Sequence, residues 1–133
     1  MSLRPGAVEV IKEITKRGIP VSIGSAVDKS HGKFLIEKTG LDKLFHQDKI
    51  IFAEDVPNTK PAPDVYLATA QKMGVDPRAQ IVFEDSPRGV LAAVAAGSMV
   101  VGMPIYWNHQ TVAELIKSGA KRVFSDWREI KID

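Results

Sequence analysis

Short apolar runs alternate with amphipathic segments along all 133 residues, and this alternation limits the possible folds more than any other feature of the chain. The apolar runs are rich in β-branched residues, which suits strands buried inside a parallel sheet. The amphipathic segments mostly end at a glycine, the residue that often follows the last turn of a helix. The pattern predicts an α/β fold with a mainly parallel sheet. We expect helices at 5–17, 29–39, 64–73, 87–96 and 110–118, and strands at 19–25, 50–53, 80–84, 98–102 and 121–124.

The composition narrows the classes of function. At this length, 44% hydrophobic residues are enough to form the core of one globular domain. Eighteen basic and 16 acidic side chains give a net charge of +2, and the lysines are scattered, so nucleic-acid binding is not expected. No apolar stretch approaches the roughly 20 residues that cross a bilayer, and no signal-peptide pattern is present. The absence of cysteine is compatible with a reducing compartment, and we expect a cytoplasmic protein.

Polar side chains gather where the expected strands end. Ser25 ends the first strand, Lys60 lies in the proline-rich loop 56–63 after the second, and Glu84 and Asp85 end the third. An open parallel sheet binds its ligands outside the carboxyl ends of the strands. We therefore expect a hydroxyl, an ammonium and two carboxylates on one rim, as in a magnesium-dependent phosphoryl-transfer site.

Each of these residues also has a structural interpretation. Glu84 and Asp85 suit Mg²⁺, which accepts one or two carboxylates and completes its shell with water and phosphate. Acids or serine before Pro87 also commonly cap a helix. Lys60 on a stiff loop can neutralise a phosphate, whereas a lone lysine is usually solvated. Ser25 can bind a phosphoryl oxygen or cap the next helix. Their position on one common rim favours a functional interpretation.

The histidines and the aromatic residues near position 106 are weaker candidates. His31, His46 and His109 include no pair at the i,i+4 spacing of helical metal ligands, so we expect them on the surface. For Tyr106 and Trp107 we favour packing over the end of the sheet rather than contact with a partner, because aromatic side chains mostly serve burial.

Three strings of residues resemble motifs II, III and IV of the haloacid dehalogenase (HAD) superfamily. They are Gly18-Ile-Pro-Val-Ser-Ile-Gly-Ser25, Lys60-Pro-Ala-Pro-Asp64 and Val82-Phe-Glu-Asp-Ser-Pro-Arg-Gly89. The similarity extends from residue 4 to about 125. It is greatest to the branch of phosphatases and phosphomutases that includes β-phosphoglucomutase-like and pseudouridine-phosphatase-like proteins.

The resemblance implies a role for each residue of the rim. Ser25, helped by the amide of Ala26, would bind phosphate, and Lys60 would bridge the phosphoryl group and the nucleophile. Asp85 would bind Mg²⁺ directly, and Glu84 would act through a metal-bound water. The implied reaction is phosphoryl transfer or hydrolysis on a small phosphorylated metabolite, by positioning and electrostatic stabilisation.

The nucleophile that this family uses is missing from the sequence. It belongs to an Asp-x-Asp-Gly-Thr motif at the end of the family's first strand, and no Asp-x-Asp occurs in this chain. We expect a leader at 1–3 and, at 4–133, a partial core: a Rossmann-like three-layer sandwich that lacks the cap and the central first strand. The two inner strand edges would pair with each other, swap between protomers, or be completed by another polypeptide.

Three functions are considered in order of preference. The first is the C-terminal core of a HAD-like phosphatase or phosphomutase, inactive alone for want of a nucleophile. The second is a non-catalytic module that binds a phosphorylated ligand. The third, a response-regulator receiver domain, needs an acidic pair at the end of its first strand, where this chain has Ser25.

Overall fold

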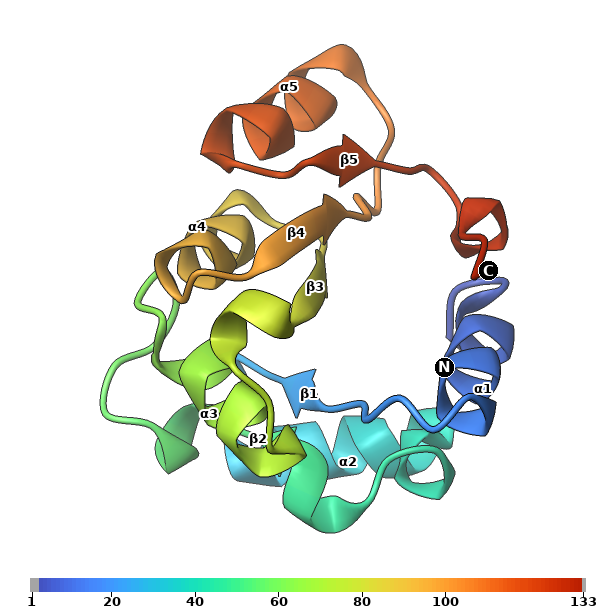
Figure 1. The fold of residues 1–133 in the computed structure, drawn as a ribbon, viewed down its shortest axis with the longest axis vertical. Helices are drawn as coiled ribbons and strands as arrows, with labels where there is room; N and C mark the ends of the chain where they lie inside the picture. Colours follow the sequence, from blue (N-terminus) through green and yellow to red (C-terminus); the bar gives the residue numbers. More distant parts are fainter. Residues whose placement is uncertain (1–2, 133) are drawn as a thin grey trace.

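Helices and strands alternate along the chain as the sequence predicts. The computed structural model describes residues 3–132. All five predicted helices are present, and α2 and α3 have the predicted bounds. The elements follow in the order α1 (Ala7–Lys16), β1 (Ile23–Gly24), α2 (Lys29–Thr39), β2 (Ile50–Ile51), α3 (Asp64–Met73), β3 (Ile81–Glu84), α4 (Pro87–Ala95), β4 (Met99–Gly102), α5 (His109–Ser118) and β5 (Arg122–Val123) (Figure 1).

Local sequence signals start the helices that matter for the rim. The side chain of Asp28 accepts a hydrogen bond from the backbone N–H of His31 at 2.8 Å and caps α2. Ser86 caps α4 in the same way, because its hydroxyl accepts from the N–H of Gly89 at 3.1 Å. Capping is therefore done by Asp28 and Ser86, and the neighbouring Ser25 and Asp85 are not used for it.

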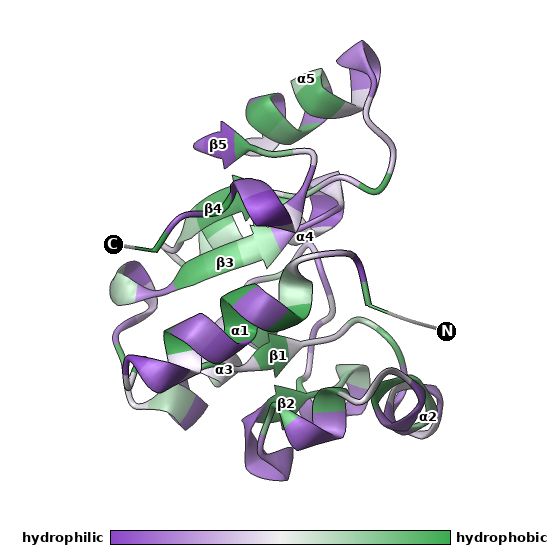
Figure 2. Ribbon diagram, turned by 90° about the vertical axis from the view of Figure 1, so that its right-hand side faces the viewer, coloured by the Kyte–Doolittle hydropathy of each residue, from purple (hydrophilic) through white to green (hydrophobic). Residues whose placement is uncertain are grey.

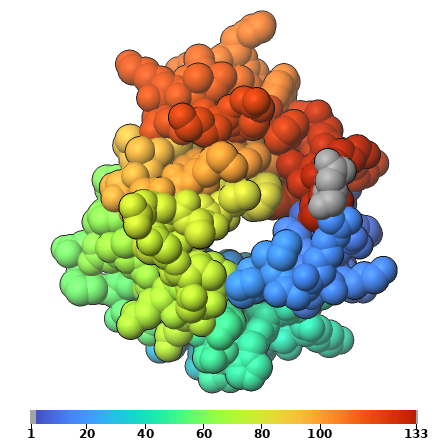
Figure 3. All heavy atoms as spheres, in the orientation of Figure 1, coloured from blue at the N-terminus to red at the C-terminus, as the bar shows by residue number. Residues whose placement is uncertain are grey.

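Every strand pair is parallel, but the strands form two separate sheets. One contains β1 and β2, and the other has the order β3-β4-β5. Within residues 3–132 the inner edges of β1 and β3 do not pair with each other, so that expected arrangement is wrong. The space-filling view shows an opening between the N-terminal segment and the residues of β3 (Figure 3). We call the space between the inner edges of β1 and β3 the slot.

The strands that border the slot or lie next to it are shorter or more exposed than predicted. Strand 19–25 is reduced to Ile23–Gly24, and strand 50–53 to Ile50–Ile51, after which the chain forms a 3₁₀ turn at Ala53–Asp55. Ile19 and Ile81 are 49% and 52% exposed, although their sequence pattern predicts burial. β1 and β3 each lack a strand on the edge that faces the slot, so fewer of their backbone groups are paired and fewer of their side chains are covered there.

Helices cover the strands on both sides. Helix α3 packs against β1 and β2, α4 against β3 and β4, and α5 against β4 and β5. Helix α1 lies on the side opposite to α3 and contacts the turn Trp127–Glu129 near the C-terminus (Figures 1 and 2). The hydrophobic strands β3 and β4 lie at the centre of this arrangement (Figure 2). Its core includes Val65, Val82, Val90, Val100 and Leu115. Within residues 3–132 no helix has the length and apolar character needed to cross a membrane.

Candidate phosphoryl-transfer site

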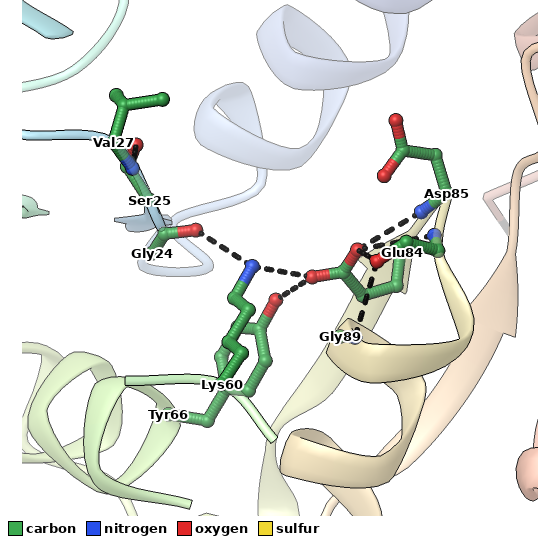
Figure 4. A network of polar contacts seen from close by, with 9 residues as sticks. Gly24, Ser25, Val27, Lys60, Tyr66, Glu84, Asp85 and Gly89 are labelled. Carbon is green, nitrogen blue, oxygen red and sulfur yellow. Dashed lines mark hydrogen bonds and ion pairs between the residues drawn. The ribbon is translucent and has the colours of Figure 1, made fainter. Parts of the chain in front are cut away.

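Lys60 joins the carboxyl ends of β1 and β3. Its Nζ lies 2.6 Å from Oε2 of Glu84, the last residue of β3, and 3.4 Å from the carbonyl oxygen of Gly24, the last residue of β1 (Figure 4). The side chains of Lys60 and Glu84 are only 12% and 6% exposed. The lysine is thus held in a fixed place at the rim, which its position in a proline-rich loop alone does not guarantee.

The carboxylate of Glu84 is fully engaged by hydrogen-bond donors. Oε2 accepts from Lys60 and from the hydroxyl of Tyr66, and Oε1 accepts from the backbone N–H groups of Asp85 at 3.0 Å and Ser86 at 3.4 Å (Figure 4). Burial acts to raise the pKa of Glu84, but the Lys60 ammonium and these donors outweigh it and hold the pKa below its usual value. Glu84 is therefore an ionised anchor for Lys60.

Asp85 lies beside this anchor in a different environment. Its side chain is exposed, and no dashed line joins its carboxylate to the other residues drawn in Figure 4. Burial of its surroundings and the negative charge of Glu84 raise the pKa of Asp85 above its usual value. The two neighbouring acids therefore have different environments. The Glu84 carboxylate accepts hydrogen bonds from groups of the protein, whereas the Asp85 carboxylate is exposed at the rim.

Ser25 follows directly on Gly24 and so reaches the same rim. Its hydroxyl accepts a hydrogen bond from the backbone N–H of Val27 at 3.1 Å, and its own N–H donates to the carbonyl oxygen of Ile51 at 2.9 Å. Ala26 is exposed next to it. The structure thus brings Ser25, Ala26, Lys60, Glu84 and Asp85 to one edge of the molecule.

Two residues of the site were not found from the sequence. Tyr66, in the first turn of α3, is buried, and burial together with the charge of Glu84 raises its pKa, so that the phenol stays protonated and donates. Arg88, in the first turn of α4, donates from Nη2 to the carbonyl oxygen of Lys60 at 2.7 Å. The sequence offers only a general signal for Tyr66, since the hydroxyl of a buried tyrosine usually has a hydrogen-bond partner.

The donor set fits Mg²⁺ through Asp85. Mg²⁺ binds proteins through one or two carboxylates and keeps several waters or phosphate oxygens, so one exposed carboxylate at a phosphate site is sufficient as a starting ligand. Both oxygens of Glu84 already accept from other groups. Among residues 3–132 no group of three or more histidine or acidic side chains is arranged so that it could hold a metal ion. Of the two acids, Asp85 is therefore the residue available to hold the ion.

The other sequence candidates lie away from this chemistry. His31, His46 and His109 are exposed, as predicted. Tyr106 and Trp107 are 77% and 55% exposed, so the expected packing over the sheet end is wrong. These two residues lie in the connection between β4 and α5 (Figure 1).

Comparison with known proteins decides the family. The family model of haloacid dehalogenase-like hydrolases matches residues 1–97. The chain belongs to this family. Among solved structures, this HAD-like chain is similar to a HAD hydrolase of family IA from Entamoeba histolytica, with a TM-score of 0.89, 34% identity and coverage of 98% of this chain and 58% of that one. A putative β-phosphoglucomutase from Thermotoga maritima gives a TM-score of 0.87 at 26% identity, over 96% of this chain and 57% of the other.

Several curated relatives of this HAD-like chain are named as phosphatases. It is 30% identical to validoxylamine A 7'-phosphate phosphatase of Streptomyces hygroscopicus subsp. limoneus, over 82% of this chain and 50% of that protein. It is 39% identical to the fructose-1-phosphate phosphatase YqaB of Escherichia coli, over 68% of this chain and 46% of that protein. The chain therefore spans about half the length of the curated relatives it matches.

Proposed function

We propose that this HAD-like chain supplies the phosphate- and magnesium-binding part of a phosphatase or phosphomutase for small phosphorylated metabolites, and that it does not turn over by itself. The observation that supports this most directly is the Lys60 ammonium, fixed at the rim between Glu84 and the carbonyl of Gly24. Phosphoryl transfer depends on positioning and on stabilising negative charge, and a cation fixed in advance provides both.

The remaining residues of the rim complete this role. Ser25 and the amide of Ala26 would bind phosphoryl oxygens. Asp85 would hold Mg²⁺, whose charge would help to neutralise the oxygens of the transferred group. Glu84 keeps Lys60 in place. No Asp-x-Asp is present in the 133 residues, so the nucleophile is not among them and a complete cycle is not expected. The names of the relatives favour phosphorylated carbohydrate-like substrates.

The slot could accept a further strand. Two parallel strand edges that face one opening fit an extended segment, which pairs with both edges at once. We propose that a strand of another polypeptide, or a swapped strand from a second copy, fills the slot. Only a strand of another polypeptide would also bring the missing acid to Lys60, because a second copy lacks the Asp-x-Asp as well. Sedimentation equilibrium tests the swapped form, because it requires a dimer. Added peptides from the region of the family that this chain lacks test the form completed by another polypeptide. A protein that stays monomeric and binds none of these peptides argues against both the swapped and the completed form.

Phosphate binding and turnover are measured separately to test the site. Inorganic phosphate is titrated into the protein with MgCl₂ present, and ³¹P NMR or calorimetry gives the dissociation constant. We expect binding, and we expect Lys60→Ala to weaken it roughly 10- to 100-fold, the effect of losing one charge-assisted hydrogen bond. The exposed Lys72 of α3 provides the matched control, Lys72→Ala, which should bind as the parent does.

Hydrolysis of p-nitrophenyl phosphate tests the expected lack of turnover. The protein with MgCl₂ should release no nitrophenol above the uncatalysed rate. Turnover that Asp85→Ala abolishes would overturn the claim that the chain is inactive alone. Failure of phosphate to bind at any accessible concentration would overturn the site itself.

A further inference from the structure

Tyr66 and Lys60 donate hydrogen bonds to the same oxygen atom of Glu84. The hydroxyl of Tyr66 donates to Oε2 of Glu84, the same oxygen that accepts from Lys60 Nζ at 2.6 Å. Tyr66 is 6% exposed, and its ring lies under the ammonium, with 5.1 Å between Lys60 Nζ and the ring centroid (Figure 4). The phenol therefore contacts both members of the ion pair, although the family resemblance stated above gives it no role.

We propose that Tyr66 is a positioning residue that holds the Glu84 carboxylate so that the Lys60 ammonium keeps a free N–H directed at the phosphoryl group. This inference rests on the proposed phosphate site and deepens it. Tyr66 does not touch the phosphoryl group. It acts on Lys60, through the Glu84 carboxylate and through the face of its ring.

The number of donors on Lys60 explains why a second donor on Glu84 matters. An ammonium has three N–H groups. One points to Glu84 and a second to the carbonyl oxygen of Gly24, which leaves one for a ligand. Without the Tyr66 hydroxyl, Oε2 would lose one of its two donors, and the Glu84 carboxylate would be free to turn and carry the ammonium with it. The third N–H of Lys60 would then no longer be held in one direction.

The ring of Tyr66 provides a second constraint that is separable from the hydroxyl. A cation over an aromatic face is attracted to it, and the contact limits where the ammonium can move. Tyr66→Phe keeps the ring and removes only the hydroxyl. Tyr106 is the other tyrosine of the chain and is 77% exposed, so Tyr106→Phe is a matched control.

The first measurement is the affinity for inorganic phosphate with MgCl₂ present. We expect Tyr66→Phe to weaken binding roughly 10-fold, the order of effect of one hydrogen bond to a charged group, and Tyr106→Phe to leave it unchanged. In the Lys60→Ala background, Tyr66→Phe should have no further effect, because Tyr66 acts through that lysine. If Tyr66 only stabilised the fold, Tyr66→Phe would lower the melting temperature, and its effect on phosphate affinity would not depend on the presence of Lys60. Equal loss of affinity in both backgrounds would overturn the proposal.

The second measurement does not depend on phosphate. In ¹H–¹⁵N spectra of lysine ammonium groups, a buried and hydrogen-bonded Lys60 should give a distinct signal, assigned by its absence in Lys60→Ala. Tyr66→Phe should shift that signal, and Tyr106→Phe should not. If phosphate does not bind but the signal shifts, the proposed function fails and the positioning by Tyr66 stands. An unshifted signal in Tyr66→Phe overturns the positioning, whatever phosphate does.

Discussion

Gly89 lies directly against the carboxylate of Glu84. A Cβ atom at position 89 would stand 1.9 Å from Cδ of Glu84 and 2.1 and 2.2 Å from its two oxygens. The first turn of α4 can approach the end of β3 this closely only because residue 89 has no side chain. The anchor of Lys60 therefore depends on the absence of a side chain at Gly89.

Gly89→Ala should displace the Glu84 carboxylate and loosen Lys60. We expect a loss of about 1–3 kcal/mol in the free energy of unfolding, the usual result of adding a methyl group to a packed interior. Phosphate affinity should fall with it, toward that of Lys60→Ala. Urea unfolding and phosphate titration of the same sample check both effects.

Gly74→Ala is the control for that substitution. Gly74 ends α3 with φ +71°, and nothing lies within 4 Å of a Cβ placed there. The left-handed backbone should cost about 1–2 kcal/mol of stability, but phosphate affinity should not change. Equal phosphate affinity for Gly89→Ala and the parent would show that the Glu84 carboxylate tolerates displacement.

Glu84 should make the protein sensitive to acid. Its pKa in the folded state lies below the ordinary 4.5, so the unfolded chain binds its proton more tightly than the folded one. The ionised Glu84 therefore contributes stability at a pH above 4.5, and this stability is lost as the pH falls from there through the lowered pKa. Urea unfolding at a series of pH values measures the loss.

Glu84→Gln should remove this part of the pH dependence. At neutral pH it should also cost about 3 kcal/mol, because it leaves the Lys60 ammonium in a largely buried place without its counter-charge. The exposed Glu37 of α2 gives the control Glu37→Gln, for which the acid profile should match the parent. A Glu84→Gln profile that also matches the parent would mean that the ion pair adds nothing to stability.

Asp85 should have the opposite effect on stability. Its folded-state pKa is raised, so the folded protein loses stability as the pH rises from the ordinary value of 3.8 through the raised one. Asp85→Asn removes this charge and should stabilise the protein at neutral pH, within about 1 kcal/mol for an exposed group. MgCl₂ should raise the melting temperature of the parent and not of Asp85→Asn. A variant that still responds to MgCl₂ would place the ion elsewhere.

The sequence predicted the helices and the gathering of Ser25, Lys60 and Glu84 at one edge, but not the contacts that hold Lys60 there. The helices were predictable because caps such as Ser86 and terminal glycines such as Gly74 act locally. The contact between Tyr66 and Glu84 was not, because it depends on how α3 packs beside β3, and no local pattern encodes that. Strand 19–25 was overestimated for a related reason: apolar β-branched residues form a strand only where a neighbour pairs with them.

Amide hydrogen exchange should show the free edge of β3 residue by residue. The carbonyl oxygens of Gln80 and Glu84 accept from Met99 and Met103 in the β4 segment, so alternate residues of β3 face β4. Because successive residues of a strand direct their backbone groups to opposite sides, the N–H groups of Ile81 and Phe83 face the slot.

The amides of Ile81 and Phe83 should therefore exchange more than about 100-fold faster than those of Val82 and Glu84, which need an opening of the sheet to exchange. NMR-detected exchange in D₂O at neutral pH measures these rates individually. A strand that enters the slot would pair with the Phe83 N–H and slow its exchange toward that of Val82. If Ile81 and Phe83 are already as protected as Val82 in the isolated protein at low concentration, the slot is closed by the chain itself and no partner strand is needed.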